Sequence, residues 1–264
     1  MATAPQAPKF VQPAGHDVIR IVPLHVPGGV VAPLAGVAAP PGPRLSYRGG
    51  PLMTAVEVFT LFWGDAWQTT QAGLAATINK FFDAILTSSL LDQLAEYNVA
   101  GQAIGHGKRT GTATAPAAHM PHSVSDNAVR HFIQQEIASN PAVPQPSKNT
   151  LYFTYLPPGV ALVQGGGKSC QAFCGYHDAI NGQIFYAAMP YPGCAGCTGG
   201  LAVADAITST SSHELCEAIT DPIPGQGWYD DVHGEIGDIC AWKSKKVGHF
   251  TVQLEWSNKA NACV

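Results

Sequence analysis

A run of 74 residues without lysine or arginine, from Ser169 to Trp242, most limits how this chain can fold. Nine acids lie within the run, and seven of them fall between Glu214 and Asp238. Crowded carboxylates repel one another unless water, protons or a bound cation screens them. The folded chain must therefore expose this region as a solvated acidic loop, keep some of its carboxylates protonated, or place a cation among them.

The overall composition is that of a globular protein with few charges. Charged residues make up 12% of the 264 residues, apolar residues make up 46%, and the formal net charge is −4. This balance excludes a highly charged disordered chain. It also argues against a nucleic-acid partner, because basic residues neither predominate nor cluster. The length suits one large domain or two small ones and is sufficient for an apolar core.

We interpret residues 1–45 as a proline-rich extended arm or pro-segment, and residues 46–264 as a single α/β catalytic-type domain. The first 20 residues contain no basic segment followed by an unbroken apolar run, so no signal peptide is visible. Residues 21–43 are apolar, but their six prolines forbid a membrane-spanning helix. We therefore expect no membrane span here.

Strand and helix patterns alternate along the remaining chain. Four segments carry β-branched or aromatic residues typical of strands: 54–63, 151–156, 184–189 and 247–256. Four others have helical spacing of apolar residues: 74–85, 90–94, 129–137 and 202–220. Residues 101–114 are compatible with a strand or a loop. The alternation predicts an α/β (α+β) fold with a single mixed sheet flanked by helices.

The ends of three helices can be predicted from single residues. Thr69 or Thr70 is a candidate N-cap for the first helix, and Ser125 for the third, because hydroxyl groups accept bonds from free helical N–H groups. The last helix should stop at Asp221, since the residue before Pro222 is disfavoured in the helical region.

Seven cysteines allow three disulfides with one thiol left over. The spacing C-x3-C…C-x2-C at positions 170, 174, 194 and 197 also resembles a structural zinc site of four thiolates. Disulfides fit an exported protein, whereas a zinc knot fits a cytosolic one. We favour disulfides that staple the loops around the acidic segment, although the spacing does not reveal their pairing.

The pattern most specific for chemistry is His213-Glu214-Leu215-Cys216-Glu217. On a helix, His213 and Glu217 share one face. This is the spacing of the two histidines in H-E-x-x-H metallopeptidases, with a carboxylate in place of the second histidine. The segment is therefore predicted to be a zincin-like active-site helix whose His213 and Glu217 bind Zn2+.

The remaining roles follow from this assignment. Glu214 directly follows the first ligand, where a general base would face the metal-bound water. A catalytic zinc site needs a third protein ligand, for which Asp238 and Glu235 are the best candidates and Asp230 and His177 weaker ones. His177 or Tyr229 is a candidate donor to the oxyanion. Calcium as a structural ion is an alternative, because it also prefers carboxylate oxygens.

Five segments together resemble one known family: GGPLMTAVEVFTLFWGDAW (49–67), FCGYH (173–177), YAAMPYPGC (186–194), SHELCEAITDP (212–222) and GEIGDIC (234–240). In this order they are similar to the conserved segments of the phosphate-induced protein 1 / EXORDIUM family and its bacterial relatives. The resemblance covers roughly residues 47–263. The paired SHEL…E and EI-D-C motifs are its specific part, and the GGP strand is less so.

The resemblance implies an extracellular protein with disulfides, since plant members are extracellular and linked to growth and cell-wall responses. It implies no particular reaction. The chain departs from the plant pattern at Asp221, where plant members have Asn, and in a shorter, differently spaced set of cysteines. Disulfide pairings are therefore not carried over from the family.

Two functions follow as hypotheses. The leading one is a secreted zinc-dependent hydrolase, in first place a metallopeptidase that acts on a peptide or protein substrate through a metal-bound water. The alternative is a non-catalytic extracellular protein that binds a cell-wall glycan and holds a structural metal, with Trp228 or Trp242 stacked on sugar rings. The sequence does not indicate an oligomeric state.

Overall fold

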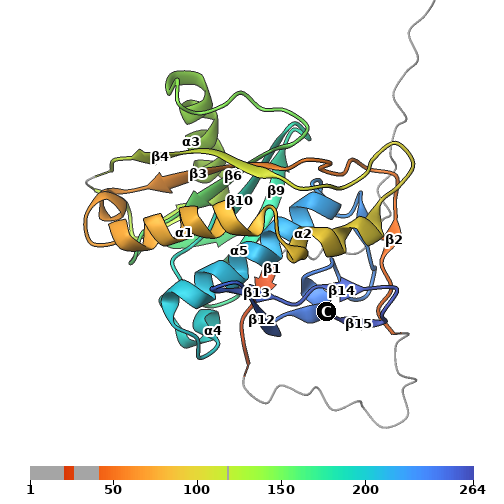
Figure 1. The fold of residues 1–264 in the computed structure, drawn as a ribbon. Helices are drawn as coiled ribbons and strands as arrows, with labels where there is room; N and C mark the ends of the chain where they lie inside the picture. The colour runs from red at the N-terminus through yellow and green to blue at the C-terminus, as the bar shows by residue number, and fades with distance from the viewer. Residues whose placement is uncertain (1–20, 27–41, 118) are drawn as a thin grey trace, which may run out of the picture.

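Six strands form the main sheet, in the order β1-β9-β10-β6-β3-β4 (Figure 1). The computed structural model describes residues 21–26, 42–117 and 119–264. Strands β10, β6, β3 and β4 run parallel, whereas β9 runs antiparallel to β10, and β1 antiparallel to β9. The strand bounds are β1 Ile21–Pro23, β3 Glu57–Trp63, β4 Lys108–Ala115, β6 Thr150–Tyr155, β9 Phe173–Ile180 and β10 Ile184–Met189.

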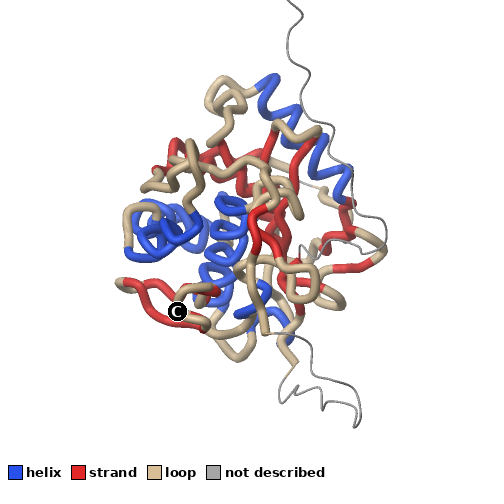
Figure 2. Tube along the Cα trace, turned by 90° about the vertical axis from the view of Figure 1, so that its right-hand side faces the viewer, coloured by secondary structure: helices blue, strands red, loops and turns tan. Residues whose placement is uncertain are grey.

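Helices cover both faces of this sheet (Figures 1 and 2). One face packs against α1 (Ala72–Ile85), α2 (Ser89–Gln93) and α5 (Val203–Thr220), and the other against α3 (Asp126–Ser139). Each face of the sheet has its own apolar core, and successive residues of a strand point to opposite faces. On β10, Phe185 therefore packs in the core on the α1/α5 side, and Tyr186 packs in the core on the α3 side. The short helices are η1 Asp65–Gln68, η2 Leu94–Tyr97, α4 Ala195–Thr198 and η3 Asp238–Cys240.

Smaller sheets surround this framework. One has the order β5-β7-β8, and three are two-stranded: β11-β2, β12-β13 and β14-β15. Their bounds are β2 Ser46–Tyr47, β5 Ser123–Ser125, β7 Ala161–Gln164, β8 Gly167–Lys168, β11 Trp228–Tyr229, β12 Ser244–Val247, β13 Phe250–Gln253, β14 Trp256–Ser257 and β15 Ala262–Cys263.

Helix α5 is buried on every side from Ala206 to Thr220. It lies between strands β9 and β10 of the main sheet, helix α1 and the hairpin strand β13. A helix enclosed in this way has no solvent face to carry its polar residues, so those residues must find partners inside the protein. The Ser211 hydroxyl lies 2.8 Å from that of Tyr155, and the Thr208 hydroxyl donates to the Thr251 carbonyl at 2.9 Å.

The fold class is confirmed: a main mixed sheet is flanked by helices, and disulfides join its loops. The strand at 184–189 and the end of α5 before Asp221 match the prediction, and the ambiguous segment 101–114 contributes residues 108–114 to β4. Ser125 is the N-cap of α3, where its hydroxyl accepts from the Ala128 N–H at 3.2 Å.

Three local predictions were wrong. The N-cap of α1 is Gln71, because the chain first forms η1 and a turn through Thr69. The single strand expected at 247–256 is a hairpin, since Gly248 adopts a φ of +58° and turns the chain between β12 and β13. Residues 21–23 belong to the main sheet as β1, although we placed them in the arm; residues 1–20 and 27–41 lie outside the described residues.

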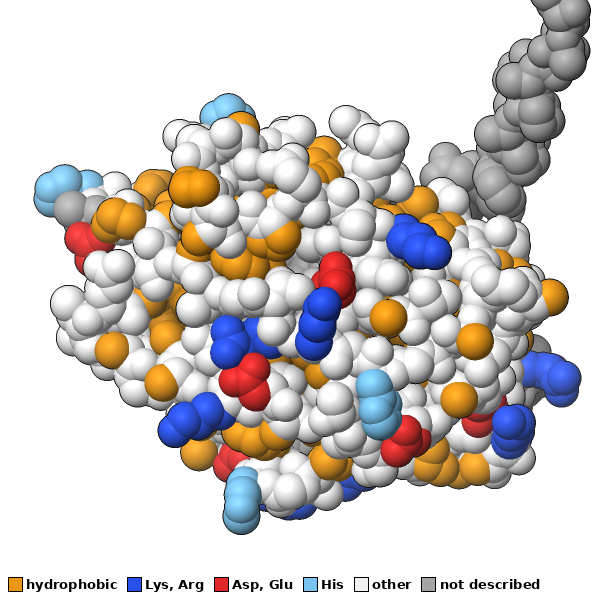
Figure 3. All heavy atoms as spheres, turned by 45° about the horizontal axis from the view of Figure 1, so that its top comes forward, with side chains coloured by type: hydrophobic (Ala, Val, Ile, Leu, Met, Phe, Trp, Pro, Cys, Tyr) orange, Lys and Arg blue, Asp and Glu red, His pale blue; other side chains and the backbone are white. Residues whose placement is uncertain are grey.

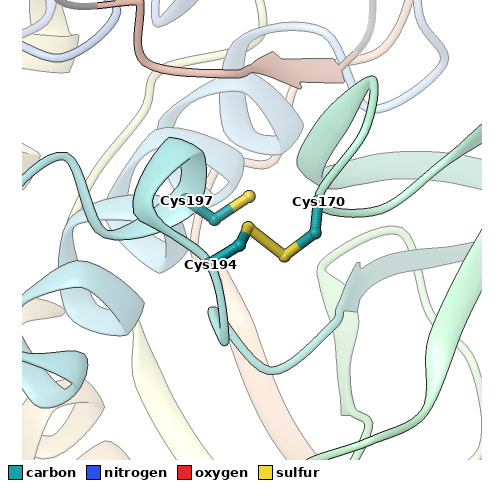
Figure 4. A group of neighbouring side chains, drawn as sticks. All are labelled: Cys170, Cys194 and Cys197. Atoms are coloured by element: carbon teal, nitrogen blue, oxygen red, sulfur yellow. A yellow bond between two sulfur atoms is a disulfide. The ribbon is translucent and has the colours of Figure 1, made fainter.

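Six of the seven cysteines form three disulfides: Cys170–Cys194, Cys174–Cys197 and Cys240–Cys263. Cys216, on α5, is a buried free thiol. The first two bonds join the segment around α4 to the start of β9, and Figure 4 shows Cys197 beside the Cys170–Cys194 bond. The four-thiolate zinc site is therefore wrong, since its four sulfurs are already paired with one another.

Charged side chains are few and scattered on the face of the molecule seen in Figure 3. This matches the low proportion of charged residues in the sequence, 12%. In the three described ranges, the longest helices are too short or too polar to cross a membrane.

The cap of α3 gives a direct test of this part of the fold. Replacing Ser125 with Ala removes the acceptor for the Ala128 N–H. We expect the free energy of unfolding to fall by about 1 kcal/mol, as is usual for loss of a helix N-cap. Urea denaturation measures the change, with Ser123→Ala as the matched control because Ser123 is an exposed residue on the same short strand. Equal effects of the two substitutions would contradict the capping role.

Candidate metal centre

Three segments far apart in the sequence bring two histidines and several carboxylates together. Helix α5 supplies His213, Glu214 and Glu217, strand β9 supplies His177, and the turn before and within η3 supplies Glu235 and Asp238. His177 is on the α5 side of β9, like Ala179 two residues later, which packs in the α1/α5 core. The side chains of this cluster are 0–5% exposed.

The first potential ligand group consists of His213, Glu217 and Asp238. Nε2 of His213 lies 2.9 Å from Oε1 of Glu217 and 3.9 Å from Oδ1 of Asp238. Ligand atoms about 2.0–2.2 Å from a tetrahedral zinc ion are themselves roughly 3.4 Å apart. One nitrogen and two carboxylate oxygens at these separations therefore fit a zinc ion with one coordination position left open.

A hydrogen-bond chain fixes the ring of His213. Its Nδ1 lies 3.0 Å from the side-chain oxygen of Gln253, and the Gln253 amide nitrogen donates to the Gly237 carbonyl at 2.8 Å. The backbone N–H of Gln253 donates to the Ser212 hydroxyl. Because the amide oxygen can only accept, Nδ1 carries a proton, and Nε2 is the nitrogen left to face the carboxylates or a metal ion. Metal-binding histidines are oriented in this way by an acceptor on the other nitrogen.

The second potential ligand group consists of His177, Glu214 and Glu217. Nδ1 of His177 lies 3.2 Å from Oε2 of Glu214 and 3.5 Å from Oε2 of Glu217. Its Nε2 lies 3.1 Å from the Asp221 carbonyl, which can only accept a hydrogen bond. Glu217 thus faces His213 with one carboxylate oxygen and His177 with the other.

Several polar atoms of the cluster have no hydrogen-bond partner within the described part of the chain. A buried polar atom without a partner is costly, and a buried charge without one is more so. A cation among these atoms would satisfy them together. The atoms are His213 Nε2, Glu214 Oε1, Glu217 Oε2, both carboxylate oxygens of Glu235, and Asp238 Oδ1.

The ionisable groups of the cluster shift one another's pKa values strongly. Burial alone would lower the pKa of His177, but Glu214 and Glu217 beside it raise that pKa to about 10. Burial alone would raise the pKa of Glu217, but His213 and His177 lower it to about 2. Burial and the charge of Glu217 raise the pKa of Glu235 well above its usual range. Positive charge, from protons or a metal ion, is therefore needed throughout the cluster.

Gly237 permits the close approach of the η3 turn to α5. A Cβ atom at this position would lie 2.8 Å from Cγ and Nδ1 of the His213 ring and 3.0 Å from Oε1 of Glu217. Contacts this short require the ring or the turn to move. Gly237, the second glycine of the GEIGD segment, is thus a packing requirement of the site.

The structure places the remaining predicted residues as follows. Glu235 lies on the His177 side, with Oε1 3.5 Å from Nε2, and its backbone N–H donates to Asp238 Oδ2 at 3.0 Å. Tyr229 lies on β11, where the Arg48 guanidinium stands 4.4 Å from its ring centre. Its role as an oxyanion donor stays a prediction. Asp230 accepts from the Arg44 N–H and caps the turn at His233.

Two residues that contribute to the site were not singled out from the sequence. Gln253 has no sequence signal, since its role depends on the hairpin β12–β13 folding against α5. Asp221 was noted as the end of the helix and as a departure from the plant pattern, but not as a site residue. Its carbonyl orients His177, and its carboxylate accepts the N–H groups of Gly225, Gln226 and Gly227.

Comparison of the chain with models of protein families, with curated proteins and with solved structures finds no match.

The role of Gln253 can be tested without removing a ligand. Gln253→Met keeps a side chain of similar length but removes the acceptor for His213 Nδ1. We expect the zinc affinity, measured by competition with a chromogenic chelator, to fall about 10–100-fold, as is usual when an outer partner of a metal-binding histidine is lost. The same substitution at the exposed Gln183 serves as the control. An unchanged affinity in Gln253→Met would contradict the assignment.

Gly237→Ala tests the packing between the η3 turn and α5. The added methyl group would meet the His213 ring and Glu217, so we expect weaker zinc binding and a lower melting temperature. Gly73→Ala on α1 is the control, because a Cβ there has no neighbour within 4 Å. Thermal unfolding with and without added zinc measures both effects, and a variant that binds zinc as the wild type does would overturn the argument.

Proposed function

We propose that the chain is a zinc-dependent hydrolase, with peptide bonds as the first substrates to examine. The observation that carries the proposal is the orientation of the His213 ring. Its Nδ1 is bound to the side chain of Gln253, and its Nε2 faces the carboxylates of Glu217 and Asp238. A catalytic zinc ion takes three protein ligands and keeps one position for water or substrate. This group of one imidazole and two carboxylates supports that arrangement.

When bound, a zinc ion supplies Lewis acidity to a substrate carbonyl and lowers the pKa of water. The residues of the chain supply the geometry and the proton transfer. His213 and Glu217 lie one turn apart on an enclosed helix, which keeps their separation constant. Glu214 and Glu235 have buried oxygens without a partner in the described ranges, so each can accept a proton. His177, between them, can carry a proton from one to the other.

The family resemblance supports the same location. Residues of the cluster come from SHELCEAITDP, FCGYH and GEIGDIC, three of the five segments that resemble the EXORDIUM family. These segments are far apart in sequence, and they meet at the cluster. Membership of the family is part of the proposal. The three disulfides support an extracellular location, because such bonds persist in oxidising compartments.

A second candidate function is a non-catalytic extracellular protein with a structural metal ion. The observation in its favour is the burial of the candidate ligands, which are 0–5% exposed. A catalytic metal ion must be reached by its substrate, whereas a structural metal ion need not be accessible. Stacking of sugar rings on tryptophan is less well supported. Trp228 packs against Tyr47 and Tyr97, and Trp242 packs against His25.

His213→Ala distinguishes these functions. We expect wild-type protein, purified without a metal-affinity tag, to contain zinc and to hydrolyse fluorogenic peptides or casein. The variant should lose the zinc held by His213 and at least 100-fold of the activity, because the ligand and the water-activating ion disappear together. His249→Ala, at an exposed histidine, is the matched control.

The outcomes separate the candidates. Zinc that depends on His213, without turnover of any peptide or ester tested, would favour the structural role. Zinc retained in His213→Ala would move the site elsewhere. Wild-type protein without a divalent metal would overturn both functions.

A further inference from the structure

We infer that the centre is built for two divalent cations bridged by Glu217, the second held by His177, Glu214 and Glu217. This inference rests on the proposed function, since Glu217 also belongs to the zinc site around His213. It adds a second metal position and makes the hydrolase a two-metal enzyme.

The spacing around His177 supports a cation. Nδ1 lies 3.2 Å from Glu214 Oε2 and 3.5 Å from Glu217 Oε2, close to the roughly 3.4 Å expected between ligands of one zinc ion. These separations are more even than those around His213, which are 2.9 and 3.9 Å. His177 is also oriented from behind, because Nε2 lies 3.1 Å from the Asp221 carbonyl.

Glu217 has the geometry of a bridging carboxylate. Its Oε1 faces His213 Nε2 at 2.9 Å and accepts the Asp238 backbone N–H at 3.1 Å, whereas its Oε2 faces His177. The side chain is fully buried, and Oε2 has no hydrogen-bond partner in the parts of the chain that are described. One carboxylate shared in this way would place two ions about 3.5–4 Å apart, the usual separation in two-metal hydrolases.

The charge of the cluster also favours two ions. The four carboxylates of the cluster carry four negative charges if ionised, and the histidines are neutral when they act as ligands. One divalent ion leaves two negative charges, and two ions leave none. The run from residue 169 to residue 242 supplies no lysine or arginine to compensate the rest. The four are Glu214, Glu217, Glu235 and Asp238.

The competing occupant of this position is a proton on His177 Nδ1. An N–H group there points best at one carboxylate oxygen, and Glu214 Oε2 at 3.2 Å is the nearer. Glu217 Oε2 and Glu214 Oε1 then stay without a partner among the described residues. A divalent cation has no such directional limit and can be bound by both carboxylates. In the two-ion centre Glu214 and His177 are accordingly ligands and do not relay a proton, and Glu235 is left as the proton acceptor.

Metal stoichiometry tests the inference on the whole chain of 264 residues. Zinc alone is added to chelator-treated protein, excess is removed, and bound metal is measured by elemental analysis. We expect two equivalents in the wild type and in His249→Ala, but one in His177→Ala and one in His213→Ala. Circular dichroism and thermal unfolding establish that each variant is folded.

A cobalt titration of the wild type needs no variant. Co2+ alone should increase the visible absorption up to two equivalents. The electron paramagnetic resonance signal should grow to one equivalent and weaken with the second, because a bridging carboxylate couples the two spins.

One equivalent in the wild type, lost in His213→Ala, would overturn the second site and leave the hydrolase proposal standing. Two equivalents in both the wild type and His177→Ala would overturn the position assigned here. No bound metal in the wild type would overturn the proposed function and this inference together.

Discussion

The side chain of Glu217 lies between two histidines in the interior of the protein, and the surrounding structure maintains that contact. Its carboxylate meets His213 on one side and His177 on the other, without exposure to solvent. An anion in such a place is stable only if positive charge and well-oriented donors stay within reach. Helix α5 therefore packs against the hairpin β12–β13 on one face and against strand β9 on the other.

Rigid elements of the fold hold the two imidazole rings in their orientations. Gln253 fixes one imidazole from the hairpin, and the end of α5 fixes the other through the Asp221 carbonyl. Disulfides tie the segments beside the site, with Cys174–Cys197 next to β9 and Cys240–Cys263 at the end of η3. Preorganised ligands of this kind lose little freedom when a cation or substrate binds.

Local pattern was sufficient to predict much of the fold and the main residues of the cluster. The end of α5 and the cap of α3 follow from single residues, and the spacing of His213 and Glu217 places them on one helical face. What the sequence did not reveal depends on contacts between distant segments. The pairing of residues 21–23 with β9, the turn at Gly248 and the position of Gln253 all arise from tertiary packing, which local propensity does not encode.

Strand β1 has a consequence for the behaviour of the sheet as a whole. Without it, the stretch Phe173–Tyr176 of β9 would present free backbone N–H and C=O groups, to which another chain could add a strand. Val22 anchors β1 against Cys174 and Cys197, so the cap on this edge depends on the neighbouring disulfide. The opposite edge, β4, is protected differently, by the charged side chains of Lys108 and Arg109. Coverage of the sheet edge nearest the cluster is thus linked to the oxidation state of Cys174 and Cys197.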